Sequence, residues 1–419
     1  MLRGRGAPPP ADPPPEVRAP DPPPGGVVSG MGVIIIAAVR HPRRRRVSPP
    51  AAADPPAPRR DAAAIARRLA AWFSRHRRDL PWRHDRDPYR VWVSETMLQQ
   101  TTVKVVVPYF ERFMRRFPTI GRLARAPIED VLAAWAGLGY YRRARHLHDA
   151  ALRVVESHAG RIPADRAALL ALPGIGRYTA GAVLSIAYGR PEPVVDGNVA
   201  RVLARLAGER RDPRSGAAAR FVLEEAARLV AASARPGDHN EALMELGATV
   251  CTPAAPACRR CPLAGVCAAR ARGMQASIPP PRRQRASEVV QRTMALVLRG
   301  RRLLVRRRAA TGLLDGLWEL PAVEPDGRGG HRLEDGPPVD LLGIAGTVRH
   351  SITWRRLTVQ VVRARLRGRA PDGRAPRGRA PRGGHRWVTP AEARRLPASS
   401  LLMKALRVAS RSPFHRADV

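Results

Sequence analysis

Four cysteines lie within one short stretch of the chain, and the sequence contains no others. They are Cys251, Cys258, Cys261 and Cys267, in the spacing C-x6-C-x2-C-x5-C. Thiolates gathered in this way are ligands for a [4Fe–4S] cluster or for zinc. Zinc sites usually pair two C-x2-C knuckles, and only one is present here, so the spacing favours iron–sulfur. A disulfide framework is disfavoured, because the chain is long and uses no cysteine elsewhere.

A glycine-containing hairpin lies upstream of the cysteines, in residues 172–180 (Leu-Pro-Gly-Ile-Gly-Arg-Tyr-Thr-Ala). Gly174 and Gly176 allow the backbone a close turn between two helical segments. Such a turn leaves N–H groups at the start of the second helix free to bind a phosphate. A helical hairpin without a ligand has the same pattern, so the hairpin alone leaves both interpretations open.

Carboxylates stand near two further elements. Asp196 precedes a helical segment in Val-Val-Asp-Gly-Asn-Val, residues 194–199. It is suited to cap that helix, and also to stabilise a cationic sugar in a transition state. Glu95 lies in residues 93–101, where Ser94 would cap a helix and Glu95 would complement its dipole. A loop in residues 137–142 carries Tyr140 and Tyr141, which are suited either to stacking on bases or to an ordinary surface.

These elements, taken in order from about residue 80 to residue 267, resemble the helix–hairpin–helix DNA glycosylases, and the MutY-type adenine glycosylases most closely. The matching segments are Pro81-Trp82 and residues 94–101, 137–141, 172–180 and 195–199, followed by the four cysteines. The resemblance implies an enzyme of base excision repair that flips adenine out of a mispair with 8-oxoguanine or guanine and hydrolyses its N-glycosidic bond. It also implies a [4Fe–4S] cluster on the four cysteines.

The resemblance assigns roles to individual positions. Glu95 matches the general acid that protonates adenine, which requires a raised pKa. Asp196 matches the carboxylate that stabilises the sugar cation or bonds to it, and Tyr178 and Asn198 match residues that position both groups. The expected DNA-binding residues include Gln100 and Tyr140, inserted at the lesion, and Leu98, beside the flipped base; the full set is Leu98, Gln99, Gln100, Tyr140, Gly174, Gly176 and Thr353.

Tyr178 separates two branches of this superfamily. Endonuclease III-like relatives carry a Schiff-base lysine at this point of the hairpin, and a phenol cannot form that imine. The sequence therefore favours a monofunctional glycosylase over an endonuclease III-like enzyme acting on oxidised pyrimidines, which remains the alternative. A DNA-binding protein without catalysis is a further alternative, disfavoured by the presence of both Glu95 and Asp196.

The chain of 419 residues divides by composition and periodicity. Residues 1–60 are rich in Pro, Ala and Arg and predict a disordered basic tail. Residues 61–275 predict an all-α domain with an iron–sulfur subdomain, and the face formed by Ile65, Leu69, Trp72 and Phe73 marks its first helix. Residues 276–290 predict a proline-containing linker. Residues 291–419 predict an α+β domain, with strands at 293–298, 303–305 and 357–366 and helices at 390–396 and 401–408.

The second domain resembles a Nudix-like recognition domain, through residues 312–321 (Gly-Leu-Leu-Asp-Gly-Leu-Trp-Glu-Leu-Pro). Residues 322–341 lack the glutamates of a Nudix hydrolase motif, so we expect no pyrophosphatase activity. The loop that reads 8-oxoguanine in relatives aligns with Ile352-Thr353-Trp354. Thr353 keeps a hydroxyl, whereas Trp354 replaces an imidazole, so the way this loop reads the lesion is left open.

The formal net charge is +39, carried almost wholly by arginine, since the chain has two lysines, Lys104 and Lys404. This charge indicates a polyanionic partner, although a GC-rich genome would produce the same composition. We expect the partner to be double-stranded DNA with A:8-oxoguanine or A:G mispairs. We expect a monomer that does not bind membranes. No targeting segment is evident, so we expect a cytoplasmic protein associated with a bacterial nucleoid.

Overall fold

The computed structural model describes residues 60–281, 286–308, 316–352, 354–367 and 384–411. It divides into two units, and the first, Met1–Pro55, lies wholly outside these ranges. The predicted disordered tail therefore falls outside the described residues apart from Arg60. The second unit, Pro56–Val419, holds a helical domain and a sheet domain, each described by itself below.

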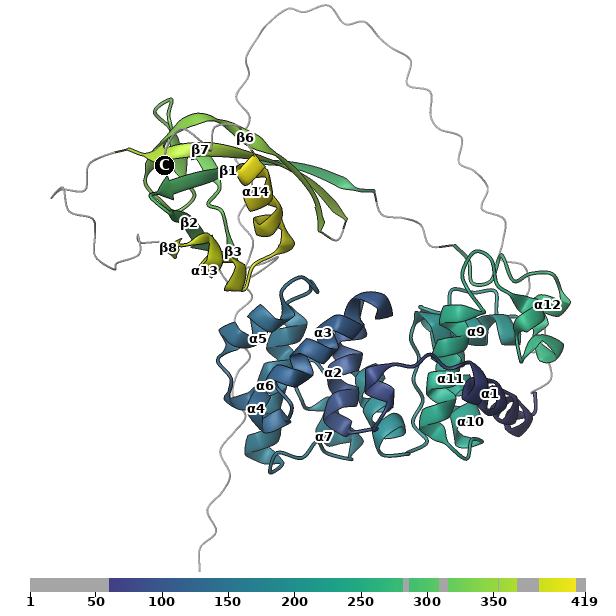
Figure 1. Cartoon of the computed structure of the whole chain (residues 1–419). Helices are drawn as coiled ribbons and strands as arrows, with labels where there is room; N and C mark the ends of the chain where they lie inside the picture. The colour runs from purple at the N-terminus through teal and green to yellow at the C-terminus, as the bar shows by residue number, and fades with distance from the viewer. Residues whose placement is uncertain (1–59, 282–285, 309–315, 353, 368–383, 412–419) are drawn as a thin grey trace, which may run out of the picture. The chain divides into compact units, whose positions relative to one another are not determined.

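The helical domain consists of short helices joined by tight turns (Figure 1). Its elements are α1 (Ala62–His76), η1 (Pro81–Arg83), α2 (Pro88–Leu98), α3 (Val103–Arg116), α4 (Ile120–Arg125), α5 (Ile128–Trp135), α6 (Arg142–Ser157), α7 (Arg166–Leu170), α8 (Arg177–Ala182), η2 (Val183–Ala187), α9 (Gly197–Ala207), α10 (Gly216–Ala231), α11 (Pro236–Thr249), η3 (Cys258–Arg260), η4 (Ala264–Val266) and α12 (Ala268–Ala271).

Two hydrophobic cores organise these helices. The first is built from residues 80–194, with Trp92, Phe110 and Trp135 fully buried at its centre. The second is built from α1, α9, α10 and α11 together with the cysteine loop. The helix at the start of the domain thus packs with the helices at its end, as the buried stripe of α1 requires. The chain crosses from the first core to the second just before α9.

The side chain of Asp61 caps α1 by accepting from the N–H groups of Ala63 and Ala64, which explains why helix begins where the proline-rich composition ends. The predicted face of Ile65, Leu69 and its neighbours on α1 is buried, so this prediction is confirmed. In the described residues, no helix is both long enough and apolar enough to span a bilayer.

The second domain is built around a mixed sheet (Figure 1). Its strands are β1 (Glu288–Arg299), β2 (Arg302–Arg307), β3 (Trp318–Glu319), β4 (Val323–Pro325), β5 (His331–Leu333), β6 (Pro338–Ile352), β7 (Arg355–Leu366) and β8 (His385–Val388). The order across the sheet is β3-β2-β1-β7-β6-β5-β4, with β8 paired to β2. The β1–β7 pair is parallel and the other pairs are antiparallel.

Helices α13 (Pro390–Arg395) and α14 (Ser400–Arg411) complete this domain. Leu401, Leu402 and Ala405 of α14 are buried in one core with β-strand residues such as Val359 and Val361. The strands and helices predicted from periodicity are therefore confirmed. The sheet starts earlier than expected, because β1 begins at Glu288, inside the stretch assigned to a linker.

Candidate active site

The predicted catalytic residues come from both cores of the helical domain. Glu95 lies on α2 and Tyr178 on α8, in the first core, whereas Asp196 stands at the N-terminus of α9 in the second. Met244 on α11 packs against both cores, and its sulfur lies 3.3 Å from the Tyr178 hydroxyl. The structure thus brings the predicted residues together where the two cores meet.

Glu95 is a carboxyl group held away from water. It is 5% exposed, and burial raises its pKa from 4.5 to about 7. The Tyr178 hydroxyl donates to Glu95 Oε2 at 2.7 Å, which favours the anion and opposes this rise. The nearby carboxylates Glu241 and Asp196 push the pKa upward, and Arg83 pulls it down. A carboxyl with this pKa exchanges a proton near neutral pH, as a general acid must.

Tyr178 is the hairpin residue that faces the acid. Burial, the nearby anions and the hydrogen bond to Glu95 hold its pKa well above its ordinary value. The phenol therefore stays protonated at neutral pH and acts as a hydrogen-bond donor.

Asp196 caps α9 and turns its second oxygen to Asn198. Its Oδ1 accepts from the Val199 N–H at 2.7 Å, and its Oδ2 accepts from Asn198 Nδ2 at 2.9 Å. The capping role expected from the sequence is confirmed, and the start of a helix suits a negative charge. Gly247 of α11 is required here, because a Cβ at that position would lie 2.6 Å from the Asn198 Cβ.

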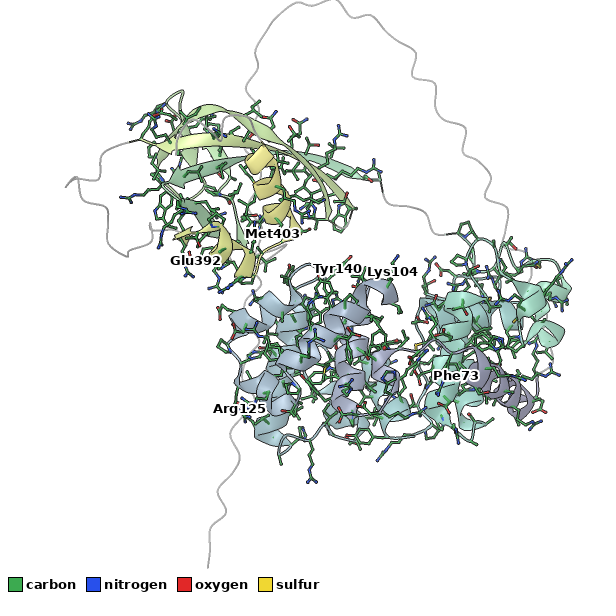
Figure 2. All side chains as sticks on the ribbon, viewed as in Figure 1. Phe73, Lys104, Arg125, Tyr140, Glu392 and Met403 are labelled. Atoms are coloured by element: carbon green, nitrogen blue, oxygen red, sulfur yellow. The ribbon has the colours of Figure 1, made fainter. Side chains whose placement is uncertain are left out.

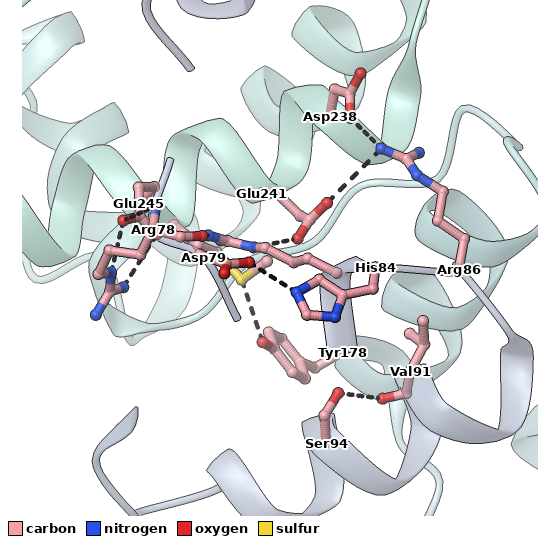
Figure 3. Close-up of polar contacts among 12 residues, drawn as sticks. Arg78, Asp79, His84, Arg86, Val91, Ser94, Tyr178, Asp238, Glu241 and Glu245 are labelled. Carbon is pink, nitrogen blue, oxygen red and sulfur yellow. Dashed lines mark hydrogen bonds and ion pairs between the residues drawn. The ribbon is translucent and has the colours of Figure 1, made fainter. Parts of the chain in front are cut away.

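A buried ion network, which sequence reasoning missed, surrounds this junction (Figure 3). Arg83 Nε pairs with Glu241 at 2.7 Å and its Nη2 with Glu245 at 3.1 Å. Arg78 forms a bidentate pair with Glu245, with contacts of 2.6 and 3.0 Å. The Arg86 guanidinium pairs with Asp238. The network joins the segment before α2 to α11, and so joins the two cores.

Burial and these pairs act on the two glutamates in opposite ways. Burial raises the pKa of Glu241 despite its partner Arg83. Burial also acts to raise the pKa of Glu245, but Arg78 and Arg83 together hold it below its ordinary value. Glu245 is therefore a structural anion, whereas the charge of Glu241 helps to raise the pKa of Glu95. The arginines and the glutamates of this network lie more than 150 residues apart in the sequence, so no local motif marks the network.

Two arginines of α9, also missed, connect the Asp196 region to the cysteines. Arg201 Nη2 donates to Asn198 Oδ1 at 2.9 Å, and its Nε donates to the Cys251 carbonyl at 2.8 Å. Arg205, 2% exposed, donates to the carbonyls of Thr252 and Pro253 and lies 3.3 Å from Cys251 Sγ. The i, i+3 spacing from Asn198 is the sequence signal that marks Arg201 as a neighbour on the helix.

The four cysteines form no disulfide, and each is partly exposed. Burial raises the pKa of Cys261 to about 11, and the other three thiols add to the rise, so the four sulfurs are near neighbours. In the residues that the structure describes, no three His, Cys, Asp or Glu side chains are arranged to hold a metal ion. Four neighbouring thiols that form no disulfide are nevertheless the donor set that iron–sulfur clusters use, so the residues fit that cofactor.

Two loop tips carry the residues expected to enter DNA. Gln100 and Tyr140 both have left-handed backbones, with φ of 58° and 49°, and both side chains are exposed. Figure 2 shows Tyr140 at the surface of the helical domain. A non-glycine residue in this region costs about 1–3 kcal/mol, and such strain concentrates at functional sites. Leu98 is half-buried, and Gln99 Nε2 donates to Thr179 Oγ1 at 3.4 Å.

The glycine hairpin has the geometry that the sequence predicted. Gly174 has φ of 75°, and a Cβ there would lie 2.6 Å from the His146 Cβ. Gly176 is the exposed residue at the start of α8, which continues directly into η2. The start of α8, at Gly176 and Arg177, is therefore exposed.

Two expectations have different outcomes. Ser94 does not cap a helix, which is a correction: α2 begins at Pro88 with Asp87 as its cap, so Ser94 is buried mid-helix and its hydroxyl donates to the Val91 carbonyl at 2.8 Å (Figure 3). The helix starts earlier because Asp87 supplies the cap and Pro88 suits the first helical position. Thr353 lies outside the described residues. Its neighbour Trp354 is 38% exposed.

A cavity of about 640 Å³ opens on the sheet of the second domain. It is lined by Gln291, Arg292, Thr293, Ala322, Val323, Glu324, Glu334, Thr358 and Gln360. Among the residues that the structure describes, none of the predicted catalytic or DNA-binding side chains lines it.

Comparison with known proteins decides the family. Residues 93–228 match the model of the HhH-GPD superfamily of base excision DNA repair proteins, and residues 293–408 match that of the NUDIX domain. Adenine DNA glycosylase of Rattus norvegicus is 37% identical over 409 residues, which cover 82% of this chain and 78% of the relative. The chain belongs to the adenine DNA glycosylase family. It is an enzyme, a DNA glycosylase with a Nudix-like second domain.

Two further relatives are also adenine DNA glycosylases. The adenine DNA glycosylase of Homo sapiens is 37% identical, covering 81% of this chain and 73% of the relative. That of Mycobacterium tuberculosis is 43% identical, covering 62% and 84%. A solved thermostable thymine-DNA glycosylase matches with a TM-score of 0.46 and 28% identity, over 50% of this chain and 97% of that one.

The Glu95 carboxyl should make folding stability depend on pH. Its pKa is raised from 4.5 to about 7 in the folded protein, so it favours folding below pH 4.5 and this contribution is lost as pH rises through 7. Glu95→Gln should therefore raise the free energy of unfolding at pH 8, by up to about 3 kcal/mol, and much less at pH 5. Urea unfolding from pH 5 to 8 measures this. Glu156→Gln, at an exposed position of α6, is the control; a pH-independent difference would contradict the raised pKa.

Proposed function

We propose that this protein hydrolyses the N-glycosidic bond of adenine mispaired with 8-oxoguanine or guanine in double-stranded DNA. The observation that carries the proposal is the dry Glu95 carboxyl, hydrogen-bonded to Tyr178 and with Asp196 nearby. The family relationship supports a DNA glycosylase and the relatives' names support adenine as the base. The choice of opposite base and the chemical roles below are our proposal.

Glu95 is the general acid in this proposal. Adenine is a poor leaving group as an anion, so a proton must reach the base as the bond to the sugar breaks. With a pKa of about 7, roughly half of the Glu95 carboxyls carry a proton at neutral pH. A protonated carboxyl near its pKa is an efficient donor. The Tyr178 hydroxyl fixes Oε2 in place, which leaves the other oxygen of Glu95 to face the base.

Asp196 supports the positive charge that develops on the sugar. Both of its oxygens accept N–H hydrogen bonds, so the carboxylate is fixed before the substrate arrives. A fixed anion beside an oxocarbenium-like sugar lowers the barrier electrostatically, or bonds to the sugar until water replaces it. Asn198 holds Asp196 Oδ2, and Arg201 in turn holds Asn198, so both are positioning residues.

DNA contacts divide between the two loop tips and the hairpin. Gln100 and Tyr140 are placed to fill the space left when adenine rotates out of the stack, because both are exposed on rigid turns. Leu98 and Gln99 lie between this tip and the acid. The N–H groups after Gly174 and Gly176 are placed to hold a backbone phosphate.

The sheet domain, over residues 291–419, reads the base opposite adenine in this proposal, with Thr353 as one contact. Its Nudix-like relationship and the exposed Trp354 beside Thr353 support such a role. The remaining boundaries that we propose are a tail to residue 60, a glycosylase domain over 61–275 and a connecting segment from 276.

Cys251, Cys258, Cys261 and Cys267 would hold a [4Fe–4S] cluster. The thiols would lose their protons on binding the cluster. Binding would therefore act against the burial that raises the pKa of Cys261. Such a cluster supplies electron transfer or structural cross-linking when bound. Arg205 would donate toward its Cys251 sulfur, and the cysteine loop would then present its arginines to DNA.

Base release should depend on both carboxylates. Single-turnover excision is measured on duplexes with A opposite 8-oxoguanine, A opposite G, or an oxidised pyrimidine. The wild type should release adenine from the first two, fastest opposite 8-oxoguanine. Glu95→Gln and Asp196→Asn should each slow release by more than about tenfold, or 1.4 kcal/mol, with DNA affinity largely kept.

Glu156→Gln is again the matched control, since it removes one carboxylate at an exposed position of α6 and should leave release unchanged. A smaller loss for either active-site variant would remove that residue from the chemical step. Release of only the oxidised pyrimidine would favour the endonuclease III-like alternative.

The enzyme should be monofunctional. Because Tyr178 occupies the hairpin position and stays a protonated phenol, no amine there can form an imine with the abasic product. Borohydride added during turnover should trap little enzyme–DNA adduct, and the abasic strand should remain intact until treated with alkali. A strong adduct would show that another residue acts as a lyase.

Freshly purified protein should be brown and contain about four irons per chain with negligible zinc. Metal analysis and the visible absorption spectrum measure this. Cys258→Ser should lower iron content and DNA affinity more than the excision rate of the bound complex, because Arg201 and Asn198 stand between Cys251 and Asp196. Stoichiometric zinc in anaerobically handled protein would overturn the assignment.

A further inference from the structure

The two tips that carry Gln100 and Tyr140 belong to different parts of the first core, yet they share a backbone state. Both residues are left-handed, and both side chains are exposed. Neither residue is a glycine, so the left-handed backbone is strained at both positions. Such strain persists only when the surrounding structure imposes it. One side chain, that of Arg143 in the first turn of α6, touches both tips.

Arg143 holds the first tip through backbone carbonyls. Its Nη1 donates to the carbonyls of Thr96 and Met97, each at 2.9 Å, and to that of Gln99. These carbonyls belong to the C-terminal end of α2, where no further turn of helix can satisfy them. A cation at a helix C-terminus is also favoured by the helix dipole. Arg143 therefore fixes the direction in which the chain leaves α2 toward Gln100.

The other guanidinium nitrogen holds the second tip. Nη2 donates to the carbonyl of Gly139 at 3.1 Å and to that of Leu138 at 3.4 Å. It also reaches Thr101 Oγ1, beyond the first tip, at 3.3 Å. The guanidinium carbon lies 5.4 Å from the Tyr140 ring centroid, within the range of a cation–π contact.

A tryptophan fixes the guanidinium itself. Arg143 lies over the Trp135 ring, 5.4 Å from its centroid, and Trp135 Nε1 donates to the same Gly139 carbonyl at 3.1 Å. Trp135 is fully buried in the first core. Arg143 is thereby held against a rigid surface, and the spacing of the two tips follows from the planar fork of one side chain.

We propose that Arg143 is a positioning residue that holds the Gln100 and Tyr140 tips at a fixed separation for extruding the base. The proposal rests on the proposed function, since it concerns the step before Glu95 acts. Arg143 does not need to touch DNA for this role, because its two terminal nitrogens are engaged by protein acceptors. Lysine cannot replace it, since one ammonium cannot span acceptors on both tips.

The adjacent Arg142 supplies a matched control. It is exposed, belongs to the same helix turn, and its Nε contacts only His146 Nε2, at 3.3 Å, among the contacts that the structure gives it. Arg142→Met removes the same charge near the same surface without touching either tip. Its effect should be a weaker, less salt-dependent affinity with an unchanged rate once bound.

The experiment compares wild type, Arg143→Lys, Arg143→Met and Arg142→Met on two substrates at saturating enzyme. One is a duplex with adenine opposite 8-oxoguanine. In the other, adenine faces a tetrahydrofuran abasic analogue and is unpaired. Both Arg143 variants should lose about 10- to 100-fold in excision rate on the first substrate, the loss expected from hydrogen bonds to a charged group. On the second they should stay within about threefold of wild type, because less work is needed to extrude the base.

A spectroscopic reading accompanies the rates. With 2-aminopurine placed beside 8-oxoguanine, wild type and Arg142→Met should raise its fluorescence on binding, as the tips unstack it, and Arg143→Lys should not. Equal losses on both substrates would mean that Arg143 supports the fold or the chemistry, and would overturn the proposal. Wild-type rates in Arg143→Lys would also overturn it. If wild type releases no adenine from either substrate, the proposed function fails first.

Discussion

The exclusion of water from the Glu95 carboxyl group is the constraint on which the rest of the site depends. Glu95 acquires a pKa near neutrality because burial outweighs the Tyr178 hydrogen bond and the attraction of Arg83. Burial alone would be achieved by any apolar wall. Here the wall includes Met244 and the charged network of Arg83, Glu241 and Glu245, so the acid sits beside ions that are already paired with each other. Because Arg83 is paired with Glu241 and Glu245, it does not stabilise the Glu95 anion enough to cancel the rise in the pKa of Glu95.

Arginine is the residue that joins the parts of this domain, and this changes the interpretation of the +39 charge. Arg143, Arg201 and Arg205 each donate to several backbone carbonyls, and each joins an active-site or cysteine segment to a helix. Their planar forks suit carbonyls at helix ends, where lysine would satisfy fewer acceptors. A share of the positive charge is therefore internal architecture, and only the exposed remainder is available to a polyanion.

Features that leave a local pattern in the sequence were predicted, whereas contacts between residues far apart in the sequence were missed. Cysteine spacing, the α1 stripe and the strands of the second domain each follow from a repeat or a fixed spacing. The prediction for Ser94 was wrong because a capping serine and a buried helical serine look alike when the helix start is placed about two turns too late. The pairs of Arg83 with Glu241 and Glu245 lie 158 and 162 residues apart. No periodicity marks such a pair, and only the packing of α11 against η1 reveals it.

The buried acid and the residues with a strained backbone lie in different places in the helical domain. Glu95 lies in a buried stretch of α2, and its hydrogen-bond partner Tyr178 is the second residue of α8. The strained residues instead lie at exposed turns, where a left-handed backbone can be imposed without disturbing the core. A base that is pushed out by the tips must arrive at an acid that does not move. Base extrusion and proton donation therefore require two different positions. Helix α2 provides both, because Glu95 lies in its buried interior and Gln100 lies just beyond its end.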